Sequence, residues 1–260
     1  MSVLKVSNLS RFFGGVKAVS GVNMDIKHGE IIGLIGPNGA GKTTFFNLLT
    51  GIYTPTEGNI VYNFNKENPI KNKAPYKIAA SGVCRTFQNI RLFSNMTVEE
   101  NVKVGLHKNI HYGVLSSFFR TGRFYSEEKV AQEKTIELLR VFNLYDKKDY
   151  LAKNLPYGQQ RRLEIARALA SGPKILLLDE PAAGMNPNET KELMELITWI
   201  RKQFDITILL IEHDMPLVMA LCSRIYVLDY GQLIAEGTPE EIKRNPKVIK
   251  AYLGGEDEAC

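Results

Sequence analysis

Residues 36–43 combine glycines with a lysine and a hydroxyl residue at a spacing that suits phosphate binding. They match the pattern G-x-x-x-x-G-K-[ST], with an apolar run at 31–35 before them and a helical run at 43–49 after them. This strand-loop-helix context is what the pattern requires. Glycines let backbone N–H groups approach phosphate oxygens closely, and the start of a helix adds the positive end of its dipole. The segment therefore predicts a phosphate-binding loop, and a chance glycine-rich turn is the weaker interpretation.

The side chains of this loop have separate expected roles. In loops of this kind the lysine, here Lys42, reaches the β- and γ-phosphates, and the hydroxyl, here of Thr43, ligates Mg²⁺. We predict that the nucleotide contacts these residues of the loop: Gly36, Asn38, Gly39, Ala40, Gly41, Lys42, Thr43 and Thr44.

Acidic side chains follow a second apolar run. Residues 174–178 are followed by Asp179 and Glu180. The carboxyl end of a parallel strand faces the ligand crevice, so we expect Asp179 to hold Mg²⁺ and Glu180 to polarise an attacking water as a general base. A third apolar run, 207–211, leads to His213, which could reach a γ-phosphate; a purely structural histidine is the alternative.

The elements that must position these residues are strands interleaved with helical stretches. We expect strands at 30–35, 174–178, 207–211 and 224–228. Such alternation predicts an α/β fold with a mainly parallel sheet covered on both faces. Residues 1–25 and 58–64 show the alternation of antiparallel strands instead.

The middle of the chain has a different character. We find no good strand pattern between residues 89 and 153. Thr97 and Glu100 form a capping-box pattern that starts a helix, and the same pattern recurs at Thr238. Residues 126–142 have helical periodicity, and residues 105–124 are expected to form a loop or short irregular insert. This region predicts a helical subdomain set into the α/β core.

Composition narrows the function classes. The net charge is +5, but lysine and arginine are scattered along the chain, which favours a solvated surface over nucleic-acid binding. The apolar runs are too short to span a bilayer, and no signal peptide is expected. Cys84, Cys222 and Cys260 form no disulfide framework, and we expect Cys84 and Cys222, which lie in apolar runs, to be buried.

Taken together, these motifs resemble the ATP-binding subunit of an ABC transporter, over nearly the whole chain. The resemblance implies a single ABC ATPase domain with a P-loop NTPase core at 1–88 and 158–260 and a helical subdomain at 89–157. It implies ATP and Mg²⁺ as ligands, with residues 36–43 as Walker A and 175–179 as Walker B.

The resemblance also carries site residues over. It makes Glu180 the catalytic glutamate, His213 the switch histidine and Gln88 the Q-loop glutamine, which would contact Mg²⁺ together with Thr43 and Asp179. Phe13 matches the aromatic residue that stacks on adenine. Its neighbour Phe12 is the rival for that role, and simple strand packing is the alternative for both.

One motif departs from the family pattern. The usual signature Leu-Ser-Gly-Gly-Gln, which binds the γ-phosphate held by the opposite subunit, is replaced by Leu155, Pro156, Tyr157, Gly158 and Gln159. Proline lacks the serine hydroxyl and a backbone donor. In the loop after the catalytic glutamate, Asn186 replaces the acidic residue that is usual in the family. We hypothesise that the two ATP sites of a dimer are unequal, the one using this signature being slower; a tolerated variant is the alternative.

Within the family, the chain resembles the LivG-type cassette of branched-chain amino-acid importers. This likeness rests on several sequence segments. They are residues 83–93, 154–167, 179–187 and 211–219, the insert at 105–124 and the C-terminal tail. It implies a second cassette, two membrane permease subunits and an extracytoplasmic solute-binding protein as partners, at the cytoplasmic face of the membrane and without nucleic acid. Alternatives are a urea or amide importer, a lipid or polysaccharide exporter and, remotely, a soluble ABC protein acting on ribosomes or DNA.

Overall fold

The computed structural model describes residues 2–64, 67–69, 73–107 and 122–253, which include only the ends of the insert expected at 105–124. The chain forms two compact units. Unit 1 comprises Met1–Arg85, Lys174–Glu180 and Ile197–Cys260, and unit 2 comprises Thr86–Pro173 and Pro181–Leu196.

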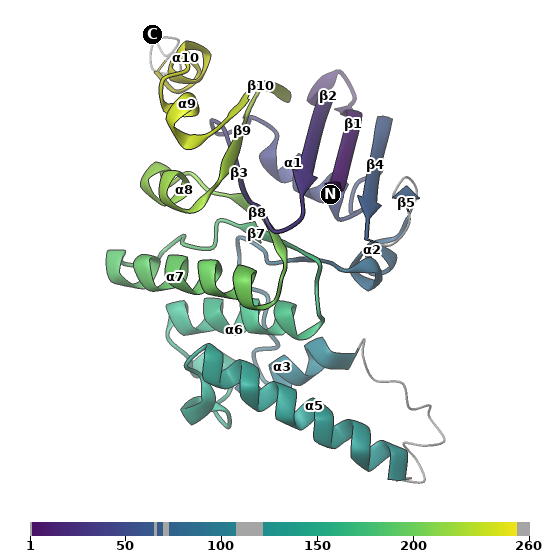
Figure 1. The fold of residues 1–260 in the computed structure, drawn as a ribbon, viewed down its shortest axis with the longest axis vertical. Helices are drawn as coiled ribbons and strands as arrows, with labels where there is room; N and C mark the ends of the chain where they lie inside the picture. Colours follow the sequence, from purple (N-terminus) through teal and green to yellow (C-terminus); the bar gives the residue numbers. More distant parts are fainter. Residues whose placement is uncertain (1, 65–66, 70–72, 108–121, 254–260) are drawn as a thin grey trace. The chain divides into compact units, whose positions relative to one another are not determined.

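Unit 1 contains two β-sheets (Figure 1). The antiparallel sheet has the order β2-β1-β4-β5, and the mainly parallel sheet has the order β10-β9-β3-β8-β7-β6. The strands of the first sheet are β1 (Ser2–Phe13), β2 (Val16–Lys27), β4 (Glu57–Asn63) and β5 (Glu67–Pro69). The strands of the second are β3 (Ile31–Ile35), β6 (Val83–Arg85), β7 (Ile175–Asp179), β8 (Thr207–Ile211), β9 (Arg224–Asp229) and β10 (Gln232–Gly237).

The centre of the parallel sheet is buried throughout and mostly apolar, with Asp179 at the end of β7 and Thr207 at the start of β8 as polar residues. All five residues of β3, of β7 and of β8 are buried, as expected for parallel strands that are covered on both faces. The four strands predicted at 30–35, 174–178, 207–211 and 224–228 are confirmed to within one residue. The edge strand β10 runs antiparallel to β9.

The antiparallel sheet alternates as predicted. Along β1, Leu4 and Val6 are buried while Lys5 is exposed. Leu4 is paired with Ile26 of β2 and with Tyr62 of β4. Because side chains alternate between faces with a period of two, this register keeps the apolar side chains on the core face.

Helices complete unit 1. They are α1 (Lys42–Leu49), α2 (Pro75–Ser81), α8 (Met215–Leu221), α9 (Pro239–Lys243) and α10 (Pro246–Leu253), together with the part of α7 (Pro187–Gln203) from Ile197 onward. The capping box predicted at Thr238 is present at the start of α9. The buried side chains of α1 join those of both sheets in one hydrophobic core, so the helix that follows the phosphate loop is anchored on both sides.

Unit 2 is helical. It contains α3 (Val98–Leu106), α5 (Gly122–Val141), α6 (Tyr157–Ala170) and the first part of α7 (Pro187–Gln203). The capping box predicted at Thr97 starts α3. Across the described part of residues 89–153 the only strand-like pairing is a single bridge from Thr97 to Leu151, which confirms the expectation of no strand there.

Two expectations in this region need correction. The helix predicted at 126–142 begins four residues earlier, at Gly122, and α3 continues to Leu106. The predicted irregular insert at 105–124 is therefore helical at both described ends. Its residues 108–121 lie outside the described part of the chain.

The cysteines differ in environment. Cys222 is buried, and this burial raises the pKa of its thiol to about 12, so it stays protonated at neutral pH. Cys84 is only half-buried, which corrects the expectation that both thiols are buried. Among the described strands, β6 lies at one edge of the parallel sheet, next to β7.

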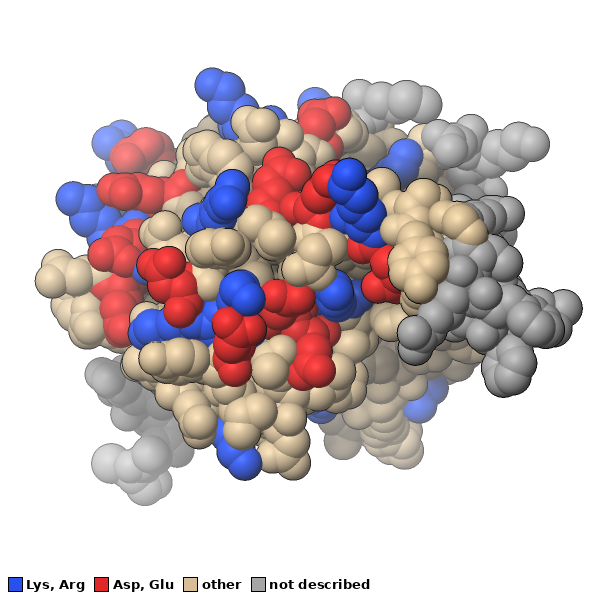
Figure 2. Space-filling view, turned by 90° about the horizontal axis from the view of Figure 1, so that it is seen from below, with Lys and Arg blue, Asp and Glu red and all other residues tan. Residues whose placement is uncertain are grey.

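The surface carries both charge signs. On the face shown in Figure 2, acidic and basic side chains lie interspersed. Among the described residues, no helix combines the length and the apolar character needed to cross a bilayer.

Candidate active site

The phosphate loop joins β3 to α1, and its backbone requires glycine at two positions. Gly36 has φ of 153°, and a Cβ there would lie 2.0 Å from the carbonyl oxygen of Leu228. Gly41 has φ of 97°, and a Cβ there would lie 2.3 Å from the carbonyl oxygen of Ala18. No other residue fits such conformations and contacts. Gly41 caps α1 without a side-chain hydrogen bond, so the first N–H groups of this helix are available to an anion.

Lys42 folds back over the loop. Its Nζ donates to the carbonyl oxygens of Gly36 at 2.6 Å and of Pro37 at 2.9 Å. Burial lowers the pKa of Lys42, while the carboxylates of Glu180 and Asp179 oppose this shift. The structure thus brings the loop lysine and the two predicted acids together. In the rest of the loop Asn38, Gly39 and Thr43 are exposed, Thr44 is half-buried and Ala40 is buried.

Asp179 lies at the end of β7 and is 4% exposed. Its Oδ2 accepts a hydrogen bond from Nη2 of Arg85 at 2.6 Å. Nη1 of Arg85 donates to Oδ1 of Asn47 at 2.7 Å. The bridge therefore connects the carboxylate of β7 to β6 and to α1, the helix that begins at Lys42. Arg85 was not among the predicted site residues; a single cation in the apolar run before the Q-loop is the signal that could have indicated it.

Glu180 follows Asp179 in an unusual conformation. Its φ is 47°, a left-handed conformation that is uncommon for a residue with a side chain and is often found at functional sites. Its backbone N–H donates to the carbonyl oxygen of Ile211 at 2.9 Å. Its Oε1 lies 3.7 Å from Nδ1 of His213, whose side chain is 65% exposed. The ends of β7 and β8 thus place the predicted general base beside the predicted histidine.

The aromatic residues at the end of β1 differ in exposure. Phe13 is 39% exposed, and its ring meets Tyr53 edge-on with centroids 5.2 Å apart. The guanidinium of Arg11 lies 4.6 Å from the centroid of the Phe13 ring. Phe12 is half-buried, and its backbone N–H donates to Oγ1 of Thr56. Phe13 is therefore the more accessible ring of the two candidates.

The predicted signature residues lie in unit 2 at the start of α6. Pro156 occupies the N-cap position with no side-chain hydrogen bond to the helix. Tyr157, the first residue of α6, is 44% exposed, and its ring packs against Gly184. Leu155 and Gly158 are buried, and Oε1 of Gln159 accepts a hydrogen bond from Lys147.

Asn186, which replaces the family's usual acidic residue, caps the following helix α7. Its Oδ1 accepts from the N–H of Glu189 at 3.0 Å, and its own N–H donates to Oε2 of Glu189 at 3.0 Å. This reciprocal pair is a capping box at the start of α7.

Gln88 also lies in unit 2, in the irregular segment between β6 and α3. Its side chain is exposed, and its carbonyl oxygen accepts from Nη2 of Arg161 at 2.7 Å. Sequence reasoning missed Arg161 and its ion-pair partner Glu164, which lies one helical turn away. The spacing of opposite charges on a predicted helix was a weak signal, because such pairs are usually exposed.

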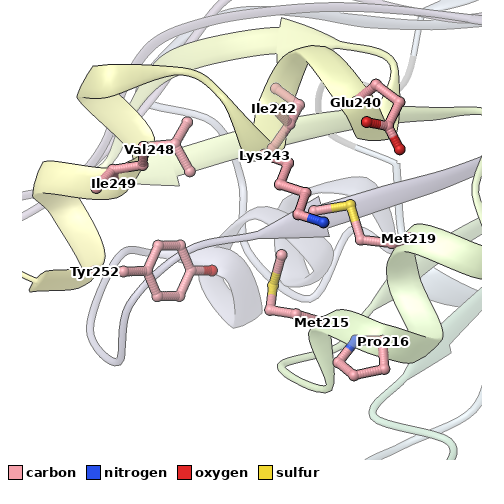
Figure 3. Close-up of a pocket in the computed structure, with 9 residues that line it drawn as sticks. All are labelled: Met215, Pro216, Met219, Glu240, Ile242, Lys243, Val248, Ile249 and Tyr252. Carbon is pink, nitrogen blue, oxygen red and sulfur yellow. The ribbon is translucent and has the colours of Figure 1, made fainter.

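The C-terminal helices border an apolar pocket of about 600 Å³ in unit 1 (Figure 3). Mostly apolar side chains from α8, α9 and α10 line it, together with the charged Glu240 and Lys243 of α9. Tyr252 belongs to this lining, and burial raises its pKa while a hydrogen bond with the backbone of Gly36 opposes the shift. The end of α10 thus contacts the first glycine of the phosphate loop.

Comparisons with known proteins agree with this geometry. The family model described as ABC transporter matches residues 19–183, and that described as Branched-chain amino acid ATP-binding cassette transporter matches residues 232–258. The chain is 48% identical over 252 residues to the high-affinity branched-chain amino acid transport ATP-binding protein BraF of Pseudomonas aeruginosa, covering 97% of this chain and 98% of BraF. It is 49% identical to the corresponding protein LivG of Escherichia coli, with the same coverage.

Solved structures show the same fold. An ATP-binding cassette of an ABC transporter in its ADP conformation superposes with a TM-score of 0.83 and 34% identity, covering 98% of this chain and 99% of the other. A nucleotide-free ATP-binding cassette gives a TM-score of 0.82 and 35% identity, covering 98% of this chain and 100% of the other.

Proposed function

Because this chain belongs to the ATP-binding cassettes of ABC transporters, we propose that it is the ATP-hydrolysing subunit of an importer of branched-chain amino acids. The observation that carries the solute class is the near full-length identity to BraF and LivG, whose names give that transport function. The match of residues 232–258 to a model of branched-chain amino-acid cassettes supports it.

The phosphate loop holds the nucleotide in this proposal. Backbone N–H groups of residues 36–44 and the start of α1 surround the phosphates, and Lys42 moves from its own loop carbonyls to the β- and γ-phosphate oxygens. The Thr43 hydroxyl, the Asp179 carboxylate and the Gln88 amide oxygen are hard oxygen ligands, the kind that Mg²⁺ prefers. The ion would neutralise charge on the phosphate oxygens.

Glu180 and His213 perform the hydrolytic step. The Glu180 carboxylate accepts a proton from the attacking water and orients it in line with the γ-phosphate, and His213, 3.7 Å away, contacts the γ-phosphate oxygens. Arg85 keeps the Asp179 carboxylate in place at the end of β7. Catalysis thus consists of positioning and charge stabilisation, as in phosphoryl transfer generally.

A second cassette completes each site, since the signature residues 155–159 contact the ATP of the opposite subunit. Two permease subunits and, indirectly, an extracytoplasmic solute-binding protein are the further partners, and they place this chain at the cytoplasmic face of the membrane. Purification from native membranes in mild detergent, followed by mass spectrometry, tests this. We expect two permeases, a second cassette and an amino-acid-binding protein; an exporter-type permease or ribosomal proteins would overturn the assignment.

The exposed ring of Phe13 predicts how ATP affinity responds to mutation. Replacing Phe13 with alanine removes the adenine platform, and loss of one base-stacking contact costs about 1–3 kcal/mol. We expect the KM for ATP to rise roughly 5- to 150-fold with kcat nearly unchanged, as measured by phosphate release. Phe12→Ala is the matched control. The opposite pattern, with only Phe12→Ala affecting KM, would assign the platform to Phe12.

The replacement of the usual signature residues by Pro156 and Tyr157 predicts that the two ATP sites of a dimer are unequal. Pro156 occupies an N-cap position that serine favours, so Pro156→Ser supplies both the missing phosphate contact and a helix cap. A regained charge-assisted contact contributes about 1.5–3 kcal/mol, so we expect turnover of the slower site to rise at least roughly 10-fold. Single-turnover ATP hydrolysis by the full complex measures this. Pro156→Ala is the control, because alanine restores the backbone N–H that proline lacks but supplies no hydroxyl. Unchanged turnover in Pro156→Ser would contradict the asymmetry.

A further inference from the structure

Arg161 has the largest fully buried side chain in the described part of the chain. It lies on α6, one turn beyond the signature residues, and its ion-pair partner Glu164 is 2% exposed. Nη1 of Arg161 lies 2.8 Å from Oε2 of Glu164. A buried ion pair offsets its cost of desolvation only with the help of additional hydrogen bonds, so the other partners of this pair are informative. Within the described part of the chain Nε of Arg161 has no hydrogen-bond partner, and the two Nη atoms make the additional bonds.

Those partners belong to the Q-loop. Nη1 of Arg161 donates to the carbonyl oxygen of Phe87 at 2.6 Å, and Nη2 donates to that of Gln88 at 2.7 Å. Oε1 of Glu164 accepts from the backbone N–H groups of Phe87 at 3.4 Å and of Arg91 at 3.1 Å. Residues 86–93 form no helix or strand, so the pair supplies hydrogen bonds that regular structure would otherwise provide.

The same guanidinium also reaches the signature. Nη2 of Arg161 lies 3.4 Å from the hydroxyl of Tyr157, the residue that stands where the family has a glycine. One cation therefore contacts the first residue of α6 and the backbone of Gln88 at the same time. All of these residues belong to unit 2.

We propose that Arg161 and Glu164 are positioning residues that fasten the Q-loop to the signature helix, so that phosphate engagement at Tyr157 changes the placement of Gln88 in the same chain. This rests on the proposed function, because the phosphate at the signature belongs to the ATP of the opposite cassette. The pair thereby couples the two ATP sites of a dimer.

The chemistry of arginine explains why this link is specific. Its planar fork donates in fixed directions to several acceptors at once, whereas the lysine ammonium is a point charge that cannot bridge the same set. In a buried network the low local dielectric makes every polar group left without a partner costly. Arg161→Lys therefore keeps the charge beside Glu164 and breaks the bridge between the signature and the Q-loop.

The test uses the intact transport complex carrying Arg161→Lys. We expect the KM for ATP to stay within about threefold and the Hill coefficient for ATP to fall toward one. We expect kcat to fall roughly 2- to 30-fold, which is the range of coupling effects in packed networks. Arg162→Lys is the matched control, because Arg162 lies next in the chain and pairs on the surface with Glu192. Wild-type kcat and cooperativity in a folded Arg161→Lys complex, or equal losses in Arg162→Lys, would overturn the proposal.

Hydrogen exchange provides a second readout if Arg161→Lys fails to assemble. In complexes blocked by Glu180→Gln, we expect MgATP to slow amide exchange in residues 87–91, and Tyr157→Phe, which removes one hydroxyl, to reduce that effect. An equal ATP response in Tyr157→Phe would overturn the coupling. Failure of the proposed function is distinguishable, because the wild-type complex would then hydrolyse no ATP or lack its transport partners.

Discussion

Replacing Glu180 with glutamine is expected to abolish ATP turnover while leaving ATP binding intact. Glutamine has nearly the same shape and keeps the hydrogen bond from the backbone N–H to Ile211, which involves no side-chain atom. It cannot accept the proton of the attacking water, and loss of a general base costs roughly 100- to 10,000-fold in rate. Because the bound ATP is not consumed, closed dimers should accumulate.

Three measurements on one preparation check this expectation: phosphate release, equilibrium binding of a fluorescent ATP analogue, and light scattering for the dimer in MgATP. Glu236→Gln is the control, since Glu236 lies on β10 and pairs with Arg224 away from the phosphate loop. Near-normal hydrolysis by Glu180→Gln would refute the role of Glu180.

Replacing Arg85 with methionine is expected to destabilise the chain strongly. The side chains of Arg85 and Asp179 are 5% and 6% exposed, and methionine fills much of the volume without the guanidinium that compensates the carboxylate. Removing one partner of a buried ion pair costs about 3–5 kcal/mol. Urea denaturation should show a lower midpoint with an unchanged slope.

A double-mutant cycle separates this charge effect from packing. In a chain that already carries Asp179→Asn, Arg85→Met should cost several kcal/mol less, because no buried carboxylate then loses its partner when the guanidinium is removed. The exposed pair of Arg244 and Glu240 supplies the control, and Arg244→Met should change stability by less than about 1 kcal/mol. Equal effects of Arg85→Met in both backgrounds would show that packing alone is responsible.

Elements with strong local signals were predictable from the sequence. The five-residue strands β3, β7 and β8 are apolar except for Asp179 and Thr207 at their ends, and α3 and α9 begin at capping boxes. The start of α5 was not predicted, because Gly122 has a low helix propensity and the preceding Thr121 is not followed by the acid of a capping box.

The site residues that have strong local sequence signals were predictable in the same way. Lys42, Asp179 and Glu180 each lie at the end of a recognisable strand or loop, and the structure brings them together. The contacts that hold them in place join residues far apart in the sequence. Arg85 meets Asp179 across 94 residues, and Arg161 meets Phe87 across 74. No periodicity or spacing encodes such pairings, because they depend on how the elements pack.

Transport of leucine into proteoliposomes tests the central claim most directly. The complex is purified with this chain and reconstituted with enclosed MgATP and the solute-binding protein outside, and uptake of radiolabelled leucine is followed. We predict ATP-dependent uptake with the wild-type chain and with Glu236→Gln, and background uptake with Glu180→Gln. Leucine uptake that is unaffected by Glu180→Gln, or a wild-type complex that hydrolyses ATP without moving leucine, isoleucine or valine, would contradict the account.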